Sequence, residues 1–136
     1  MGYLKYLLDS NIWLEELLNQ EKADDVYDFL KKTDSSLLCI SEFSLYSIGL
    51  ILNRLEKIES FDDFVKDIHS SETKVIRLLP KDMSDVIKTI KKFGLGFDDA
   101  YQYVAAEKYG LVIVSFDSDF DKTKRGRKTI EDLSDE

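Results

Sequence analysis

The sequence predicts an α/β fold: one domain with a central, mostly parallel β-sheet flanked by helices. Short apolar runs suited to buried strands alternate along the chain with longer segments of helical periodicity. This alternation is typical of βαβ units, whose strands form parallel sheets. A length of 136 residues fits a single domain over residues 1–136.

Four short apolar runs are expected to form the strands, over residues 3–8, 37–40, 74–79 and 111–114. Pro80 ends the third run, because proline lacks the N–H that a strand ladder needs. Ser10 and Ser41 are suited to cap the helices that follow the first two strands. Helices are expected over residues 11–20, 23–32, 42–58, 61–70, 82–92 and 98–109. Residues 129–136 form an acidic tail that is expected to be flexible.

Acidic residues cluster where the predicted strands end. Asp9 follows the first strand, and Glu42 lies two residues past the second, in the first turn of its helix. The helix before the last strand opens with two acids, and three more follow that strand; these are Asp98, Asp99, Asp117, Asp119 and Asp121. Ligands of parallel α/β sheets bind outside the carboxyl ends of the strands. The sequence therefore brings carboxylates from four segments to one edge of the sheet.

Carboxylates this close repel one another and raise each other's pKa unless a positive charge lies among them. A divalent cation supplies that charge, and Mg²⁺ or Mn²⁺ prefers hard oxygen ligands. The chain has one cysteine, Cys39, and one histidine, His69, which excludes a disulfide and a histidine-rich zinc site. An EF-hand loop starting at Asp117 is excluded, because Lys122 and Lys128 stand where it requires Gly and Glu.

Net charge and hydropathy limit the classes of partner. The chain has 27 acidic and 19 basic residues, a net charge of −8, which disfavours sequence-independent wrapping of nucleic acid. The run KTKRGRK, residues 122–128, is a local exception that could contact phosphates. With no apolar run of membrane-spanning length and no signal-peptide pattern, we expect a cytoplasmic protein without membrane contact.

Three segments together resemble the PIN-domain nucleases, most closely the VapC-like toxin ribonucleases, and the resemblance covers nearly the whole chain. The first is YLLDSNIWLE, the second is CISEFSLYSIG, and the third is FDDAYQYVAAEKYGLVIVSFDSDF. The positions that match the family pattern are Asp9 with Ser10 and Asn11, Glu42, Asp99, Ser115, Asp117 and Asp119. Asp98 is expected to cap its helix or to support Asp99. Asp121 has no counterpart in the family.

The resemblance implies a divalent-metal-dependent endoribonuclease that hydrolyses single-stranded RNA, commonly dimeric and often neutralised by an antitoxin protein. In that interpretation Asp9, Glu42, Asp99 and Asp117 are catalytic. The metal ligands are Asp9, Asp99 and Asp117, with Mg²⁺ or Mn²⁺ as the ion. Asp119, Ser115, Asn11 and Asp98 support them, and Lys124, Arg125 and Arg127 contact the RNA.

Less specific interpretations remain for each feature. Asp9 could only cap its helix, Glu42 could only favour the helix dipole, and the basic run could be ordinary solvated surface. At the level of function, the alternatives are a non-catalytic PIN-like module that binds RNA or protein, and a nuclease of RNA processing that is not a toxin.

Overall fold

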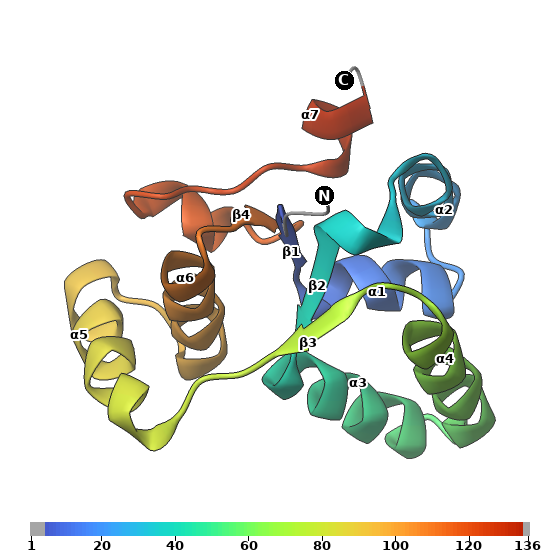
Figure 1. The fold of residues 1–136 in the computed structure, drawn as a ribbon, viewed down its shortest axis with the longest axis horizontal. Helices are drawn as coiled ribbons and strands as arrows, with labels where there is room; N and C mark the ends of the chain where they lie inside the picture. The colour runs from blue at the N-terminus through green and yellow to red at the C-terminus, as the bar shows by residue number, and fades with distance from the viewer. Residues whose placement is uncertain (1–4, 135–136) are drawn as a thin grey trace.

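The computed structural model describes residues 5–134 and contains a four-stranded, fully parallel sheet in the order β3-β2-β1-β4 (Figure 1). The strands are β1 (Tyr6–Leu8), β2 (Leu38–Ser41), β3 (Lys74–Ile76) and β4 (Val112–Val114). The predicted α/β class with a sheet flanked by helices is confirmed. The expected start of the first strand at Tyr3 and Leu4 lies outside the described residues.

Helices fill the connections between the strands. They are α1 (Ser10–Leu17), α2 (Ala23–Lys32), α3 (Glu42–Arg54), α4 (Ile58–Ser70), α5 (Met83–Phe93), α6 (Phe97–Tyr109) and α7 (Ile130–Ser134), with short 3₁₀ turns η1 (Ser35–Leu37), η2 (Pro80–Asp82) and η3 (Ser118–Lys122). α3 ends earlier than expected, because Glu56 adopts a left-handed conformation with φ 59° that no α-helix accommodates.

The segment predicted as a flexible tail is instead ordered as far as the structure describes it. Ile130 and Leu133 of α7 are buried in the core beside α2. Lys32 of α2 donates hydrogen bonds to the carbonyl oxygens of Leu133 and Ser134. These two apolar side chains, three positions apart, are enough to dock one helical turn against the core. The acidic composition of the segment did not indicate this contact. The last two tail residues, 135 and 136, lie outside the described residues.

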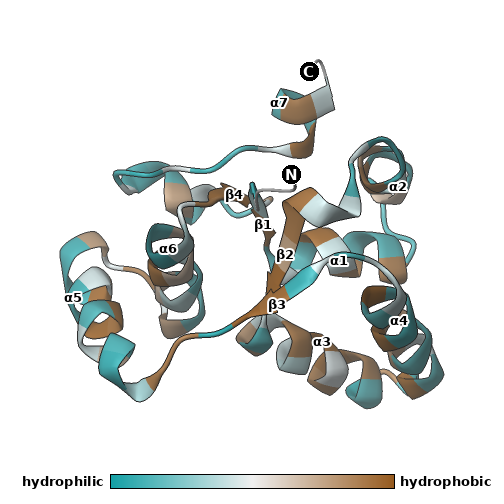
Figure 2. Ribbon diagram, in the orientation of Figure 1, coloured by the Kyte–Doolittle hydropathy of each residue, from teal (hydrophilic) through white to brown (hydrophobic). Residues whose placement is uncertain are grey.

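Alternating side chains of the strands separate the core into two layers. Leu7 of β1 and Cys39 of β2 pack with α5 and α6, whereas their neighbours Leu8 and Ile40 pack with α1, α2, α3 and α4. Figure 1 shows α5 and α6 on one side of the sheet and α1, α2 and α4 on the other. In Figure 2 β2 is coloured as hydrophobic, as expected for a strand covered on both faces.

The sheet order creates a switch point beside β1. The chain moves from β1 to β2 to β3 in one direction and then returns to place β4 on the other side of β1. The edge of β4 is covered by the C-terminal segment, since Lys128 donates its N–H to Ile113 O at 2.8 Å and accepts from Ser115 N at 3.1 Å. Crevices at such switch points are where α/β sheets bind ligands. Among residues 5–134, no helix combines the length and the apolarity that crossing a bilayer requires.

Two tyrosines of α6 bind the chain just after β3. The Tyr101 hydroxyl accepts a hydrogen bond from the buried Leu78 N–H at 2.8 Å, and the more exposed Tyr109 hydroxyl donates to Arg77 O at 3.2 Å. The Tyr101 bond satisfies a backbone donor that has left the sheet ladder. It therefore holds the long crossover toward β4 in place.

Replacing Tyr101 with Phe is expected to lower the free energy of unfolding by about 1–3 kcal/mol, because a buried N–H loses its acceptor. Tyr109→Phe is the matched control and should cost less than about 0.5 kcal/mol, as is usual for exposed sites. Urea unfolding followed by circular dichroism measures both. Equal midpoints for the two variants would contradict a structural role for the Tyr101 hydroxyl.

Candidate metal centre

Asp9 lies at the floor of the site, directly after β1 and at the N-cap of α1. Its Oδ1 accepts hydrogen bonds from Ser10 N at 2.9 Å and Gln102 Nε2 at 3.1 Å, and its Oδ2 accepts from Ser115 Oγ at 2.7 Å. Burial raises the pKa of Asp9, while these hydrogen bonds oppose the rise by stabilising the carboxylate, and the nearby charge of Asp117 adds to it. Asp9 is thus a buried acid whose orientation is fixed from three sides.

The turn after β4 is built around the hydroxyl of Ser115. Its oxygen accepts hydrogen bonds from Asp117 N at 2.9 Å and Asn11 Nδ2 at 3.2 Å while it donates to Asp9. Asn11 Oδ1 in turn accepts from Phe116 N at 3.2 Å. Because the hydroxyl is fully engaged, Ser115 orients a carboxylate rather than a water.

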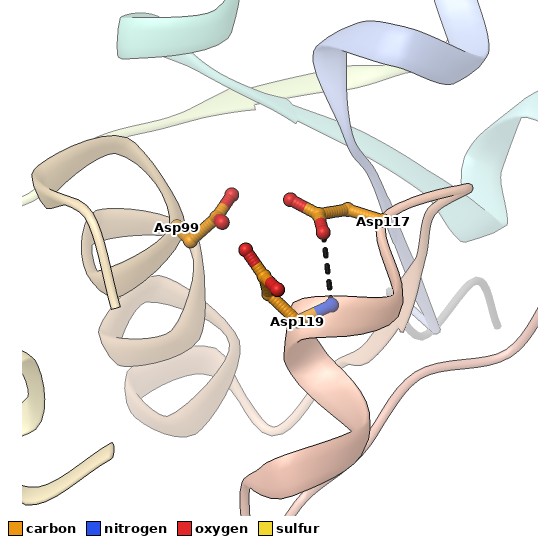
Figure 3. A group of neighbouring side chains, drawn as sticks. All are labelled: Asp99, Asp117 and Asp119. Carbon is orange, nitrogen blue, oxygen red and sulfur yellow. Dashed lines mark hydrogen bonds between the residues drawn. The ribbon is translucent and has the colours of Figure 1, made fainter. Parts of the chain in front are cut away.

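Three carboxylates meet above this floor. Asp99 in the first turn of α6, Asp117 after β4 and Asp119 in η3 each offer an oxygen within 4.8 Å of the others (Figure 3). Figure 3 shows the three side chains turned toward a common point, with the Asp119 N–H donating to Asp117 Oδ1 at 2.9 Å. Oxygen ligands at this spacing suit a hard divalent cation.

Electrostatic strain is concentrated on Asp99. Burial first, then a hydrogen bond shared with Asp117, and then the charges of Asp117, Asp98 and Asp9 raise the pKa of Asp99 from 3.8 to about 8. Acids that share a site in this way titrate as a coupled group. Without a cation, one proton therefore stays in the group at neutral pH. A divalent ion would replace that proton and relieve the repulsion.

The acids line a cavity of about 300 Å³. Its lining residues are Asp9, Ser10, Asn11, Leu14, Phe43, Ser44, Ser47, Ile51, Asp98, Asp99, Gln102 and Asp117. A somewhat larger hollow of about 360 Å³ lies elsewhere, between α1, α2 and α4, and contains no site acid. The smaller cavity is the candidate site, because it lies at the switch point and four of the predicted acids line it.

Glu42 is not brought into this cavity. α3 contributes Phe43, Ser44, Ser47 and Ile51 to the wall, and Glu42 is neither in the lining nor in the acidic triad. The reason is helical geometry: Glu42 lies two residues before Ser44, which is about 200° around the helix axis. The first turn of α3 therefore presents hydroxyl groups to the site where the sequence suggested an acid.

Two of the three expected ligands lie in the triad, and the third lies beside it. Asp119, predicted as a supporting residue, is in the triad with Asp99 and Asp117, whereas Asp9 lies beside the triad with its oxygens largely occupied by hydrogen bonds. Asp98 is exposed in the first turn of α6 and lines the cavity, but Gly96 is the N-cap.

Two residues that the sequence reasoning missed also hold the floor. Gln102 and Ser44 are both buried and are hydrogen-bonded to each other at 2.8 Å. Gln102 follows Asp99 by three positions, so helical spacing places it on the same face of α6, but only its hydrogen bonds show what it contacts.

The basic run serves the fold more than was expected. Arg127 donates to Ser115 O at 3.0 Å and forms a two-pronged pair with Asp121, which lowers the pKa of Asp121. Arg125 donates to the carbonyl oxygens of Ala106 and Leu111. These contacts fasten the C-terminal segment behind the site acids. Lys124 is exposed beside α5.

The sheet order, the acidic carboxyl edge and the cavity at the switch point define the chain as an α/β protein with a candidate metal centre. A family model described as PIN domain matches residues 6–126, and the chain belongs to this family. The resemblance seen in the three motifs is therefore confirmed for the PIN domain. A search of curated protein sequences finds no match.

Solved structures share the fold over nearly the full chain. PAE2754 from Pyrobaculum aerophilum is 26% identical with a TM-score of 0.72, over 96% of this chain and 92% of that one. DNA-bound VapBC from Salmonella typhimurium is 19% identical with a TM-score of 0.76, over 93% and 98%. VapC20 of Mycobacterium tuberculosis, a sarcin-ricin loop cleaving toxin, is 15% identical with a TM-score of 0.74, over 86% and 93%.

Asp99→Asn is expected to stabilise the metal-free protein in a pH-dependent way. The folded-state pKa of Asp99 is raised above the unfolded value of 3.8, so ionisation disfavours the folded state increasingly between pH 3.8 and about 8. Asparagine does not ionise and removes this loss.

Melting temperatures in EDTA across this pH range test the prediction. The Asp99→Asn protein should exceed the wild type most at or above pH 8, and the difference should shrink toward pH 4. Asp28→Asn on the exposed face of α2 is the control and should show no such trend. A difference that is constant with pH would contradict the assignment of the strain to Asp99.

Proposed function

We propose that this protein is a divalent-metal-dependent endoribonuclease that hydrolyses phosphodiester bonds of single-stranded RNA, acting as the toxin of a toxin–antitoxin pair. The observation that carries the proposal is the converging triad of Asp99, Asp117 and Asp119 at the switch point of a PIN domain. One protein of the same fold is VapC20, a toxin that cleaves the sarcin-ricin loop. At 15% identity it supports the proposal only through the shared fold.

The acids fall into three groups in this proposal. Asp99, Asp117 and Asp119 hold Mg²⁺ or Mn²⁺, and Asp9 holds the floor beside them, with one Oδ2 lone pair left for the ion or its water. Bound there, the ion lowers the pKa of a coordinated water and offsets charge on the phosphate oxygens. No histidine or thiol is required, which suits a cavity lined by carboxylates, serine hydroxyls, amides and apolar groups. Asp98 adds negative charge at the rim.

An exposed aromatic side chain supports single-stranded RNA as the substrate. Phe97 opens α6 two residues before Asp99, and its side chain is 49% exposed. Its ring lies 6.0 Å from that of Phe43, which lines the cavity and packs on Tyr101 at 5.2 Å. An exposed ring stacks on unpaired bases, which only single strands and loops offer. Lys124 is the residue of the basic run most available to a phosphate.

Cleavage of a mixed single-stranded RNA pool with Mn²⁺ or Mg²⁺ tests the activity. Asp99→Asn and Asp117→Asn should each lower the cleavage rate by about 100-fold or more, because several kcal/mol of metal-derived stabilisation is lost. EDTA should have the same effect, and Asp28→Asn should leave the rate unchanged.

The outcomes separate the proposed functions. Cleavage that survives both EDTA and Asp99→Asn would refute a metal-dependent mechanism. An absence of cleavage in a protein that also fails to bind Mn²⁺ would favour the alternative of a PIN-like module that binds RNA or protein without cutting it.

The hollow between α1, α2 and α4 supports an antitoxin as partner. Its floor is apolar and includes Trp13 and Phe64, whose rings lie 5.4 Å apart. The indole N–H of Trp13 is buried and has no acceptor among residues 5–134. An unpaired donor in an apolar hollow suits a segment of another chain that brings backbone carbonyls and apolar side chains.

The charge around this hollow specifies the segment further. Glu16, Asp63 and Asp67 all line it. Burial, and then the charge of Asp67, raises the pKa of Glu16, so the acids already repel one another. A partner segment with lysine or arginine beside its apolar residues would relieve that repulsion. This is the kind of segment we propose for the antitoxin.

The double variant Asp63→Lys, Asp67→Lys should weaken binding of a candidate antitoxin encoded beside this gene by about tenfold or more, because like charges then meet at the contact. Trp13 is the only tryptophan of the chain and lies in the hollow, so its fluorescence reports binding directly. The single variant Asp28→Lys on the outer face of α2 is the control. Unchanged affinity in the double variant would place the partner elsewhere.

A homodimer is supported by the outer face of α3. Tyr46 and Leu50 lie one helical turn apart there and are 60% and 56% exposed, while Ile48 and Leu52 of the same helix are buried in the core. Large apolar side chains left exposed side by side on a helix favour burial against a second copy of the chain.

A further inference from the structure

Gln102 is a buried polar residue in the middle of the candidate site. It follows Asp99 by one helical turn on α6 and is only 2% exposed. Its Nε2 donates to Asp9 Oδ1 at 3.1 Å and to Ser44 Oγ at 2.8 Å. Ser44 Oγ also accepts from Ser10 Oγ at 2.8 Å. The amide therefore connects the floor acid of β1 to helix α3, across the cavity that all four residues line.

The other end of the amide has no partner. Gln102 Oε1 is buried and accepts no hydrogen bond from any residue between 5 and 134. Rotating the amide does not cure this, because the carbonyl oxygen would then face the Asp9 carboxylate and two acceptors would meet. An unpaired buried acceptor is costly, and the rest of this stretch of α6 is filled with apolar side chains and tyrosines. Gln102 is thus kept here at a cost to the stability of the fold, which packing alone does not explain.

We propose that Gln102 is a positioning residue of the metal centre: Nε2 fixes the Asp9 carboxylate beside the acidic triad and ties it to Ser44 of α3. The inference rests on the proposed function of the site. Helix α3 gives the cavity wall only hydroxyl and apolar groups. The buried amide of Gln102, and no acid of α3, therefore connects that helix to Asp9.

The amide is suited to this position because it is neutral. The site already contains four carboxylates, from Asp9, Asp99, Asp117 and Asp119. A fifth acid in the place of Gln102 would add to the repulsion that Asp99 carries. An amide supplies donors for Asp9 and Ser44 without adding charge. Groups that orient metal ligands from behind in this way strongly affect metal affinity.

The test is the affinity of the protein for Mn²⁺ alone, measured from the electron paramagnetic resonance signal of the free ion. Gln102→Leu removes both hydrogen-bonding ends at similar volume. Its Kd for Mn²⁺ is expected to rise by about 10–100-fold, because Asp9 loses a donor that orients it. Its melting temperature without metal is expected to change little, because burying leucine and removing the unpaired acceptor offset the two lost hydrogen bonds. Gln102→Met provides the same test if the leucine variant fails to fold. Thr89→Val, a buried polar site on α5 outside the cavity, is the control.

A purely structural role predicts the opposite pair of results, namely a lower melting temperature and an unchanged Kd. That outcome overturns the proposal and leaves the proposed function intact if the wild type still cleaves RNA with Mn²⁺. A wild-type protein that does not bind Mn²⁺ overturns both. Weaker Mn²⁺ binding in the leucine or methionine variant, with a normal fold and a normal Thr89→Val control, supports the assignment.

Discussion

The structure has to hold mutually repelling carboxylates close together at one edge of a parallel sheet. Asp99, Asp117 and Asp119 come from separate elements, yet their oxygens lie within 4.8 Å. Partial burial removes the water that would otherwise screen them, and the pKa of Asp99 rises to about 8. Such an arrangement persists only when the surrounding structure determines it from several sides.

Hydrogen bonds to Asp9, the acid beside this triad, provide part of the support from the surrounding structure. Ser115 Oγ is hydrogen-bonded to Asp9, Asn11 and the N–H of Asp117. One hydroxyl therefore fixes the Asp9 carboxylate and the turn after β4 that carries Asp117. Arg127 holds the same turn from behind through Ser115 O. The C-terminal segment is therefore part of the site, although it contributes no ligand. This explains why basic residues follow the acids so closely in the sequence.

The sequence predicted which segments meet but not which way every side chain points. Asp9, Asp99 and Asp117 follow strands or open a helix beside them, so the topology of a parallel sheet brings them together. Glu42 satisfied the same rule, but it is neither in the lining of the cavity nor in the acidic triad. Gln102 escaped notice because a glutamine inside an apolar helix carries no motif. Its role appears only when its distances to Asp9 and Ser44 are known.

The net charge of −8 limits how this protein can meet RNA. Long-range attraction is unfavourable, and two of the three arginine and lysine residues predicted to contact phosphates are engaged by the fold. In the proposed function, local features would have to provide the binding: a cation among the acids, the exposed ring of Phe97 and the exposed amine of Lys124. A divalent cation would offset two negative charges of the carboxylates at the cavity, so the proposal requires metal binding to precede RNA binding. The acidic cluster would then repel RNA in the metal-free protein and repel it less once an ion is bound.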